Sequence, residues 1–141
     1  MAAHGAPELE IPVWQFVRIM VALEDAAAGN ADRKNGPRAL YEAWRAIWEP
    51  LDHELAALGE SDADAFADLM MRQTVVLDGP TAAQRAVLAR ILDGVIGAMR
   101  AAIAREDGDA AHRQSLAFEI ADLSALQTRI RAAKTRRRSR T

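Results

Sequence analysis

Two apolar stripes at helical spacing, in the C-terminal part of the chain, constrain the fold more than any other feature. Apolar residues recur every three or four positions across 82–105. Across 110–134 a stripe of apolar residues and one glutamine, Gln127, steps by four, three, four and three. This spacing predicts two amphipathic helices. Because the break between them, at 107–109, is short, we expect the two helices to form an antiparallel hairpin.

Three further segments predict helices over 12–28, 37–58 and 62–77. With the hairpin they give an all-α fold, a four- or five-helix bundle. The segment 12–28 is rich in β-branched residues, so a buried strand is the alternative interpretation. We favour a helix because a lone strand would have no partner in an otherwise helical chain. Since this helix is apolar nearly all round, it should lie at the centre of the bundle or at a subunit contact.

Capping residues mark the starts of the later helices. Thr81 and Gln84 match a capping box before the fourth helix, and Asp109 is placed to cap the fifth. Ser61, with Asp64 three residues later, predicts the N-cap of the third helix.

The composition bounds the class of protein. The chain has 141 residues and no cysteine, which excludes disulfides, thiolate catalysis and iron–sulfur clusters. We expect one helical domain over 12–134, a flexible N-terminus over 1–11 and a disordered, Arg-rich tail over 135–141. The longest apolar run is too short to cross a membrane and the start lacks a secretory pattern, so we expect a cytoplasmic protein. The excess of arginine (16) over lysine (2) is typical of a GC-rich bacterial genome.

The charges are strongly segregated along the chain. Residues 1–128 hold 11 basic and 20 acidic side chains, a net charge of −9. Residues 129–141, the cationic tail, hold seven basic side chains and no acidic one. These basic residues are Arg129, Arg131, Lys134, Arg136, Arg137, Arg138 and Arg140. The overall net charge of −2 therefore conceals an acidic body and a basic end.

The cationic tail allows three interpretations. It can be a solvated end that favours solubility or folds onto the acidic body. It can be an arm that binds nucleic acid, since the guanidinium suits phosphate, although no aromatic residue stands among the arginines to stack on bases. It can also bind anionic lipid or an acidic protein.

Two carboxylate–histidine pairs have the spacing of metal ligands. Glu49 and His53 are four positions apart, and Asp109 and His112 are three apart. Di-iron helical bundles use inward-facing pairs of this kind. Glu49 and His53 fall on the polar side of their helix, however, and Asp109 has a sufficient role as a cap. No Gly-rich phosphate loop or nucleophile motif is present, so we expect no cofactor and no catalysis.

Aromatic residues and one glutamine mark a candidate groove or interface. Trp44 and Trp48 lie one helical turn apart with Tyr41 nearby, which favours a core position over a groove. Gln127 is a single polar residue on the apolar stripe of the last helix. It is either a buried side chain with ordinary hydrogen-bond partners or one that fixes the register of a subunit contact. Trp14 completes the candidate set.

The turn at 77–81 also allows a helix-turn-helix, in which Gln84 and Arg85 would contact bases. The fourth helix is long and strongly apolar, which favours a bundle core instead. Gly94 and Gly97 leave one side of this helix with small residues only, which indicates close helix–helix packing or, as the alternative, room for a ligand or a partner helix.

These patterns predict a non-catalytic helical interaction or regulatory protein. We expect the bundle to form a homodimer or to hold a protein partner, and the cationic tail to engage an anionic partner. Nucleic-acid binding through the cationic tail is the first alternative. A carboxylate–histidine metal enzyme is the second.

Overall fold

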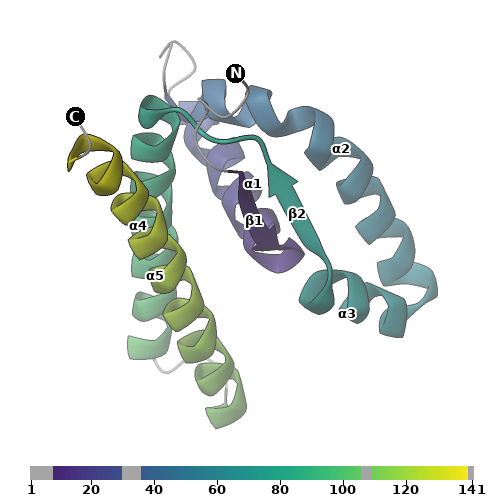
Figure 1. Ribbon diagram of the computed structural model, residues 1–141. Helices are drawn as coiled ribbons and strands as arrows, with labels where there is room; N and C mark the ends of the chain where they lie inside the picture. The colour runs from purple at the N-terminus through teal and green to yellow at the C-terminus, as the bar shows by residue number, and fades with distance from the viewer. Residues whose placement is uncertain (1–7, 30–35, 106–108, 140–141) are drawn as a thin grey trace. The chain divides into compact units, whose positions relative to one another are not determined.

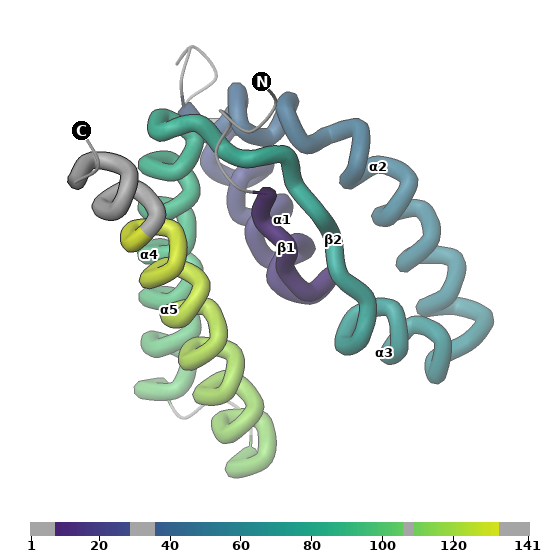
Figure 2. Tube along the Cα trace, viewed as in Figure 1, coloured from purple at the N-terminus to yellow at the C-terminus, as the bar shows by residue number. Residues whose placement is uncertain are grey.

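The computed structural model describes residues 8–29, 36–105 and 109–139, apart from the side chains of residues 29 and 133–139. Figure 2 follows the described chain in colour. The chain divides into two compact units, an N-terminal unit (residues 1–84) and a C-terminal unit (residues 85–141). The elements shown in Figure 1 are β1 (Leu9–Pro12), α1 (Val13–Gly29), α2 (Pro37–Ser61), α3 (Ala63–Arg72), β2 (Thr74–Leu77), α4 (Ala82–Ala104) and α5 (Ala110–Ser139).

The predicted helical hairpin is confirmed by α4 and α5, which pack closely along one another. The Gln127 side chain on α5 donates hydrogen bonds to the Ala89 carbonyl oxygen and to Asp93 Oδ1, both on α4. Buried leucines and isoleucines lie on both helices, as the stripes predict. The described part of the chain contains five helices, which confirms the predominantly α fold class.

The helix starts follow the capping predictions in two cases and depart from them in one. The Thr81 backbone N–H donates to Gln84 Oε1, and the Gln84 N–H donates to Thr81 Oγ1, so the capping box is formed. Asp109 caps α5 by accepting a hydrogen bond from the His112 N–H.

The third helix starts differently from the prediction. Ser61 ends α2 and donates its hydroxyl to the Ala57 carbonyl oxygen, so it is not the N-cap of α3. Asp62 takes that role, because its Oδ1 accepts a hydrogen bond from the Ala65 N–H. Ser61 remains inside the preceding helix because α2 runs past residue 58, its expected end.

A two-stranded antiparallel sheet corrects two predictions. Residues 74–77, expected at the end of a helix, form β2, and residues 9–11, expected in a flexible N-terminus, belong to β1. Ile11 pairs with Val75 and Leu9 with Leu77, and all four side chains are buried. The strands alternate buried and exposed residues, which is the period of a half-buried sheet. A strand therefore has a partner in this chain, although the partner lies far away in the sequence.

Helix α1 is the centre of the N-terminal unit. It contacts α2, α3, β1 and β2, and it is a helix rather than the alternative strand. Phe16 on α1 is fully buried, with ring centroids 6.3 Å from Trp44 and 6.0 Å from Trp48 on α2. Such tilted aromatic contacts bury large apolar areas. The central position predicted from its apolar surface is confirmed within this unit.

No helix in the described residues combines the length and the apolar character that a membrane span requires. Helix α5 extends to Ser139, beyond the predicted end at residue 134. The single domain over 12–134 and the disorder of 135–141 stay predictions.

Candidate functional site

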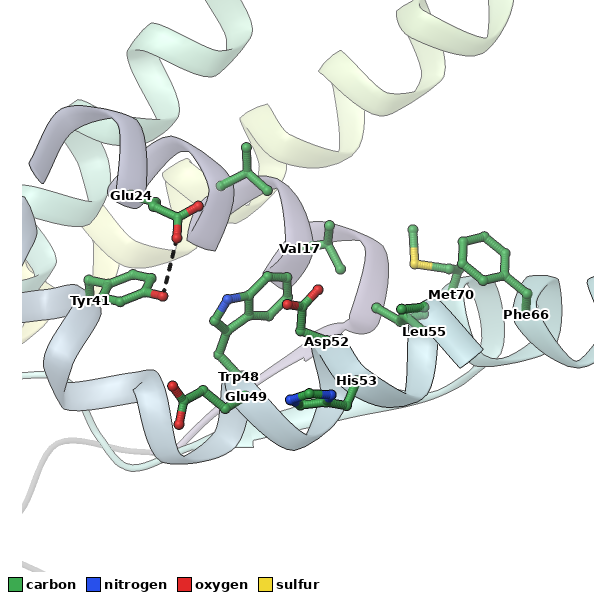
Figure 3. A pocket seen from close by; sticks show the side chains of 12 residues that line it. Val17, Glu24, Tyr41, Trp48, Glu49, Asp52, His53, Leu55, Phe66 and Met70 are labelled. Atoms are coloured by element: carbon green, nitrogen blue, oxygen red, sulfur yellow. Dashed lines mark hydrogen bonds between the residues drawn. The ribbon is translucent and has the colours of Figure 1, made fainter. Parts of the chain in front are cut away.

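A groove of about 500 Å³ lies in the N-terminal unit, lined by residues of α1, α2 and α3 (Figure 3). This volume is in the range of ordinary ligand pockets. Its apolar lining comprises Val17, Val21, Leu55, Ala56, Phe66 and Met70. Val21 is 46% exposed although it is a large aliphatic residue on a helix that is otherwise well buried. The groove therefore leaves apolar surface in contact with water.

Helical periodicity explains how each wall is built. Val17, Val21 and Glu24 follow one another at steps of four and three, so they share one face of α1. On α2, Trp48 and Asp52 are four positions apart and line the groove together. Phe66 and Met70 repeat the same step on α3 and complete the third wall.

Glu24 lies at one end of the groove, and apolar side chains occupy the other end. In Figure 3, Glu24 and Tyr41 lie at one end, Trp48 and Asp52 lie in the middle, and Phe66 and Met70 lie at the far end. The groove is therefore polar at one end and apolar at the other.

Tyr41 and Glu24 link α2 to α1 at the polar end. The Tyr41 hydroxyl donates a hydrogen bond to Glu24 Oε2 at 3.4 Å. Burial raises the pKa of the Tyr41 hydroxyl above its ordinary value, and the negative charge of Glu24 raises it further. The hydroxyl therefore stays protonated and remains a donor to Glu24 at neutral pH.

The carboxylates of the groove are only partly neutralised. Arg45 Nε donates to Glu49 Oε2 at 2.9 Å, and Arg45 also contacts Glu42 at 3.4 Å. The Glu49 carboxylate raises the pKa of Arg45. Asp52 makes no ion pair within the described residues, and none of the lining residues is a lysine or an arginine. The groove has a net negative charge.

The surface around the groove has the same sign. Residues 37–72, which span α2 and α3, include eight acidic and three basic residues, and every one of the eight acidic residues is exposed. Two of the three basic residues, Arg45 and Arg72, are paired with carboxylates of their own helices. A cation approaching these helices therefore meets a negative field.

The structure separates the residues that the sequence grouped as a candidate groove. Tyr41 and Trp48 do line the groove. Trp14 and Trp44 are buried, with Trp44 in contact with Phe16. Gln127 lies in the C-terminal unit, where its Nε2 donates two hydrogen bonds to α4. Of the five residues, only two belong to this site.

The metal-ligand candidates are divided between the two units. Glu49 and His53 line the groove, where Glu49 is held by Arg45. Asp109 and His112 are joined at the start of α5 by the capping hydrogen bond. Within the described residues, no group of three or more histidine, aspartate or glutamate side chains is placed to hold a metal ion.

Most of the cationic tail lies outside the described side chains. Arg129 is exposed on α5, and Arg131 Nη2 lies 3.4 Å from Asp93 Oδ2 on α4. The side chains of Lys134, Arg136, Arg137, Arg138 and Arg140 are outside the described residues.

The structure does not fit the helix-turn-helix, the alternative that the sequence already disfavours. Strand β2 lies between α3 and α4, so the two helices are not joined by a tight turn. Arg85 is buried, and the Gln84 side chain is used in the capping box. Neither side chain is therefore positioned to contact the bases of DNA.

Sequence reasoning missed the residues that make the groove a site. Val21, Glu24 and Asp52 were not singled out, because each is unremarkable on its own helix. The sequence did contain one signal: an apolar and an acidic residue share a helical face twice, as Val21 and Glu24 on α1 and as Trp48 and Asp52 on α2.

The lining combines apolar side chains with carboxylates, aromatic rings and one histidine, His53. Apolar side chains beside carboxylates and aromatic rings suit a ligand that combines apolar and cationic groups. The chain matches no protein-family model, no curated protein and no solved structure.

Proposed function

We propose that this protein is a non-catalytic interaction protein that holds a segment of a protein partner in the groove between α1, α2 and α3. The observation that carries this proposal is the groove itself, which is lined by exposed Val21 and by carboxylates that are only partly neutralised. Exposed apolar surface in a concave site is a candidate position for another molecule to bind.

The chemistry of the groove defines the partner segment. Apolar side chains of the partner cover Val21 and Met70, and a basic side chain pairs with Asp52 or Glu24. One partner segment can make both kinds of contact, because Glu24 and Phe66 lie at opposite ends of the groove (Figure 3). The carboxylates favour basic partners and repel acidic ones.

The cationic tail is the second contact element of this proposal. Its seven basic residues engage an anionic partner through guanidinium–carboxylate or guanidinium–phosphate pairs. A cytoplasmic location and a dimeric or partner-bound state belong to the same proposal.

A pair of matched substitutions tests the role of the groove. Val21→Lys places an ammonium group on the groove floor, where it competes with a basic segment of the partner. Val76→Lys makes the same change on β2, at a valine of similar exposure (49%) that does not line the groove. Both full-length variants are expressed in the native cell, and chemically crosslinked partners are quantified by mass spectrometry.

We expect Val21→Lys to lower the yield of a specific crosslinked partner by about tenfold or more, as loss of an interface anchor does. Val76→Lys should retain the yield of the unmodified protein. Equal yields from the two variants would remove the groove as the site of contact.

A further inference from the structure

From the charge of the groove and of the chain's own C-terminus we infer that the groove receives the cationic tail of a second copy of this protein. This inference rests on the proposed function of the groove and names its partner. The groove supplies an apolar floor and three carboxylates, Glu24, Glu49 and Asp52. Residues 129–141 hold seven basic side chains and no acidic one; Arg131 among them already lies 3.4 Å from Asp93 of α4, so the other six supply the charge for this contact.

The arginine side chain fits both parts of the groove. Its three-carbon stem is apolar and can cover a residue such as Val21, while its guanidinium pairs with a carboxylate of the lining such as Glu24 or Asp52. The planar guanidinium also stacks on aromatic rings, and Trp48 and Tyr41 both line the groove. Lysine shares the charge but lacks the fork that binds a carboxylate through two hydrogen bonds.

The acceptors for these arginines are present in the groove. Asp52 has no ion pair within the described residues, and Glu24 accepts only the long hydrogen bond of 3.4 Å from Tyr41. Arg45 is engaged with Glu42 and Glu49, so it does not neutralise the other two carboxylates. An incoming guanidinium therefore gains acceptors without displacing an existing strong ion pair.

A tail of one copy bound to the groove of the next is a heterologous contact, in which different surfaces meet. Repeated contacts of this kind form open chains or closed rings, and the smallest ring is a dimer in which two copies exchange tails. Each copy keeps a groove and a cationic tail. Self-association should therefore increase steadily with concentration and decrease with salt.

Two charge-matched double variants of the full-length chain test this contact. Glu24→Gln with Asp52→Asn removes two negative charges from the groove. Glu54→Gln with Glu60→Gln removes two negative charges from exposed positions of α2 that do not line it. A third variant, Arg136→Gln with Arg137→Gln and Arg138→Gln, weakens the cationic tail. Circular dichroism checks that each variant keeps its helical content.

The masses are measured by analytical ultracentrifugation over a range of concentrations at 50 and 500 mM NaCl. We expect the unmodified chain to associate at the lower salt and to weaken by about tenfold at the higher salt, because exposed ion pairs are screened. The groove variant and the tail variant should each weaken association by about fivefold. The Glu54 and Glu60 control should behave like the unmodified chain.

A labelled peptide of residues 129–141, added to the tail variant, measures the contact directly. Fluorescence anisotropy should show saturable binding that the Glu24 and Asp52 substitutions weaken by about fivefold. A chain that stays monomeric at all concentrations overturns the inference, as does association that survives the tail substitutions or an equal effect of the control variant. A tail that folds back on its own copy would give the monomeric result.

Failure of this inference can be told from failure of the proposed function. If the peptide does not bind while Val21→Lys still abolishes partner capture, the groove binds another protein and the second copy is excluded. If Val21→Lys and Val76→Lys capture partners equally, the groove is not a docking site for any of them.

Discussion

The contacts inside each of the two units differ in how far apart in the sequence their residues lie. In the N-terminal unit the first element, β1, pairs with the last strand, β2. The Thr74 hydroxyl on β2 donates a hydrogen bond to Glu10 Oε2 on β1, although the two residues are 64 positions apart in the sequence. In the C-terminal unit two helices that follow one another directly pack side by side. Local patterns are sufficient to specify the second arrangement, whereas the first depends on a pairing that no local pattern contains.

The largest expected effect tests whether the pairing of β1 with β2 stabilises the N-terminal unit. Ile11 is fully buried and pairs with Val75, so Ile11→Ala removes buried methyl groups and leaves a cavity. We expect a loss of about 3 kcal/mol in the free energy of unfolding, measured by urea denaturation. Val76→Ala, an exposed position on the same ladder, should change it by less than about 0.5 kcal/mol. A small effect at Ile11 would show that β1 adds little to the core.

The difference between the units explains what the sequence could predict. The hairpin, the Thr81 capping box and the Asp109 cap follow from residues within a few positions of each other, and all three are confirmed. The strands were missed because residues 74–77 continue a helical pattern locally and acquire their alternation only against residues 9–12. The groove was missed for the same reason, because Val21, Asp52 and Met70 belong to three helices.

The second prediction concerns the polar contact inside the C-terminal unit. Gln127 Nε2 donates to the Ala89 carbonyl oxygen and, at 2.6 Å, to Asp93 Oδ1. Gln127→Glu replaces this donor with a carboxylate facing two acceptors. We expect the free energy of unfolding to fall by about 2 kcal/mol at neutral pH, as measured by thermal unfolding. The loss should shrink as the pH falls, because the carboxyl group introduced by this substitution becomes a donor again once it is protonated.

A compensating substitution distinguishes this contact from general sensitivity of the site. Asp93→Asn supplies an amide donor opposite the new carboxylate, so the double variant should recover a large part of the lost stability. Equal stability of the single and double variants would show that Gln127 acts through packing alone.

The third prediction returns to the N-terminal unit and tests the corrected start of α3. Asp62 caps this helix through the Ala65 N–H, whereas Ser61 donates back to the Ala57 carbonyl oxygen. Asp62→Ala should lower the free energy of unfolding by about 1 kcal/mol, and Ser61→Ala by only a few tenths. Chemical denaturation of both variants decides the matter. The reverse order would restore Ser61 as the cap.

The smallest expected effect is a gain in stability on α4. Gly94 and Gly97 are exposed in the interior of this helix, and a Cβ added at either position would meet no atom within 4 Å. Close packing over these glycines, one expectation from the sequence, is therefore absent among the described residues. Because alanine loses less backbone entropy on folding, Gly94→Ala and Gly97→Ala should each stabilise the chain by about 0.5 to 1 kcal/mol. Thermal unfolding at low and at high protein concentration checks this prediction. If the variants are more stable than the unmodified chain at both concentrations, this face is open to solvent. If they are less stable at the high concentration, a second molecule packs closely on the glycines.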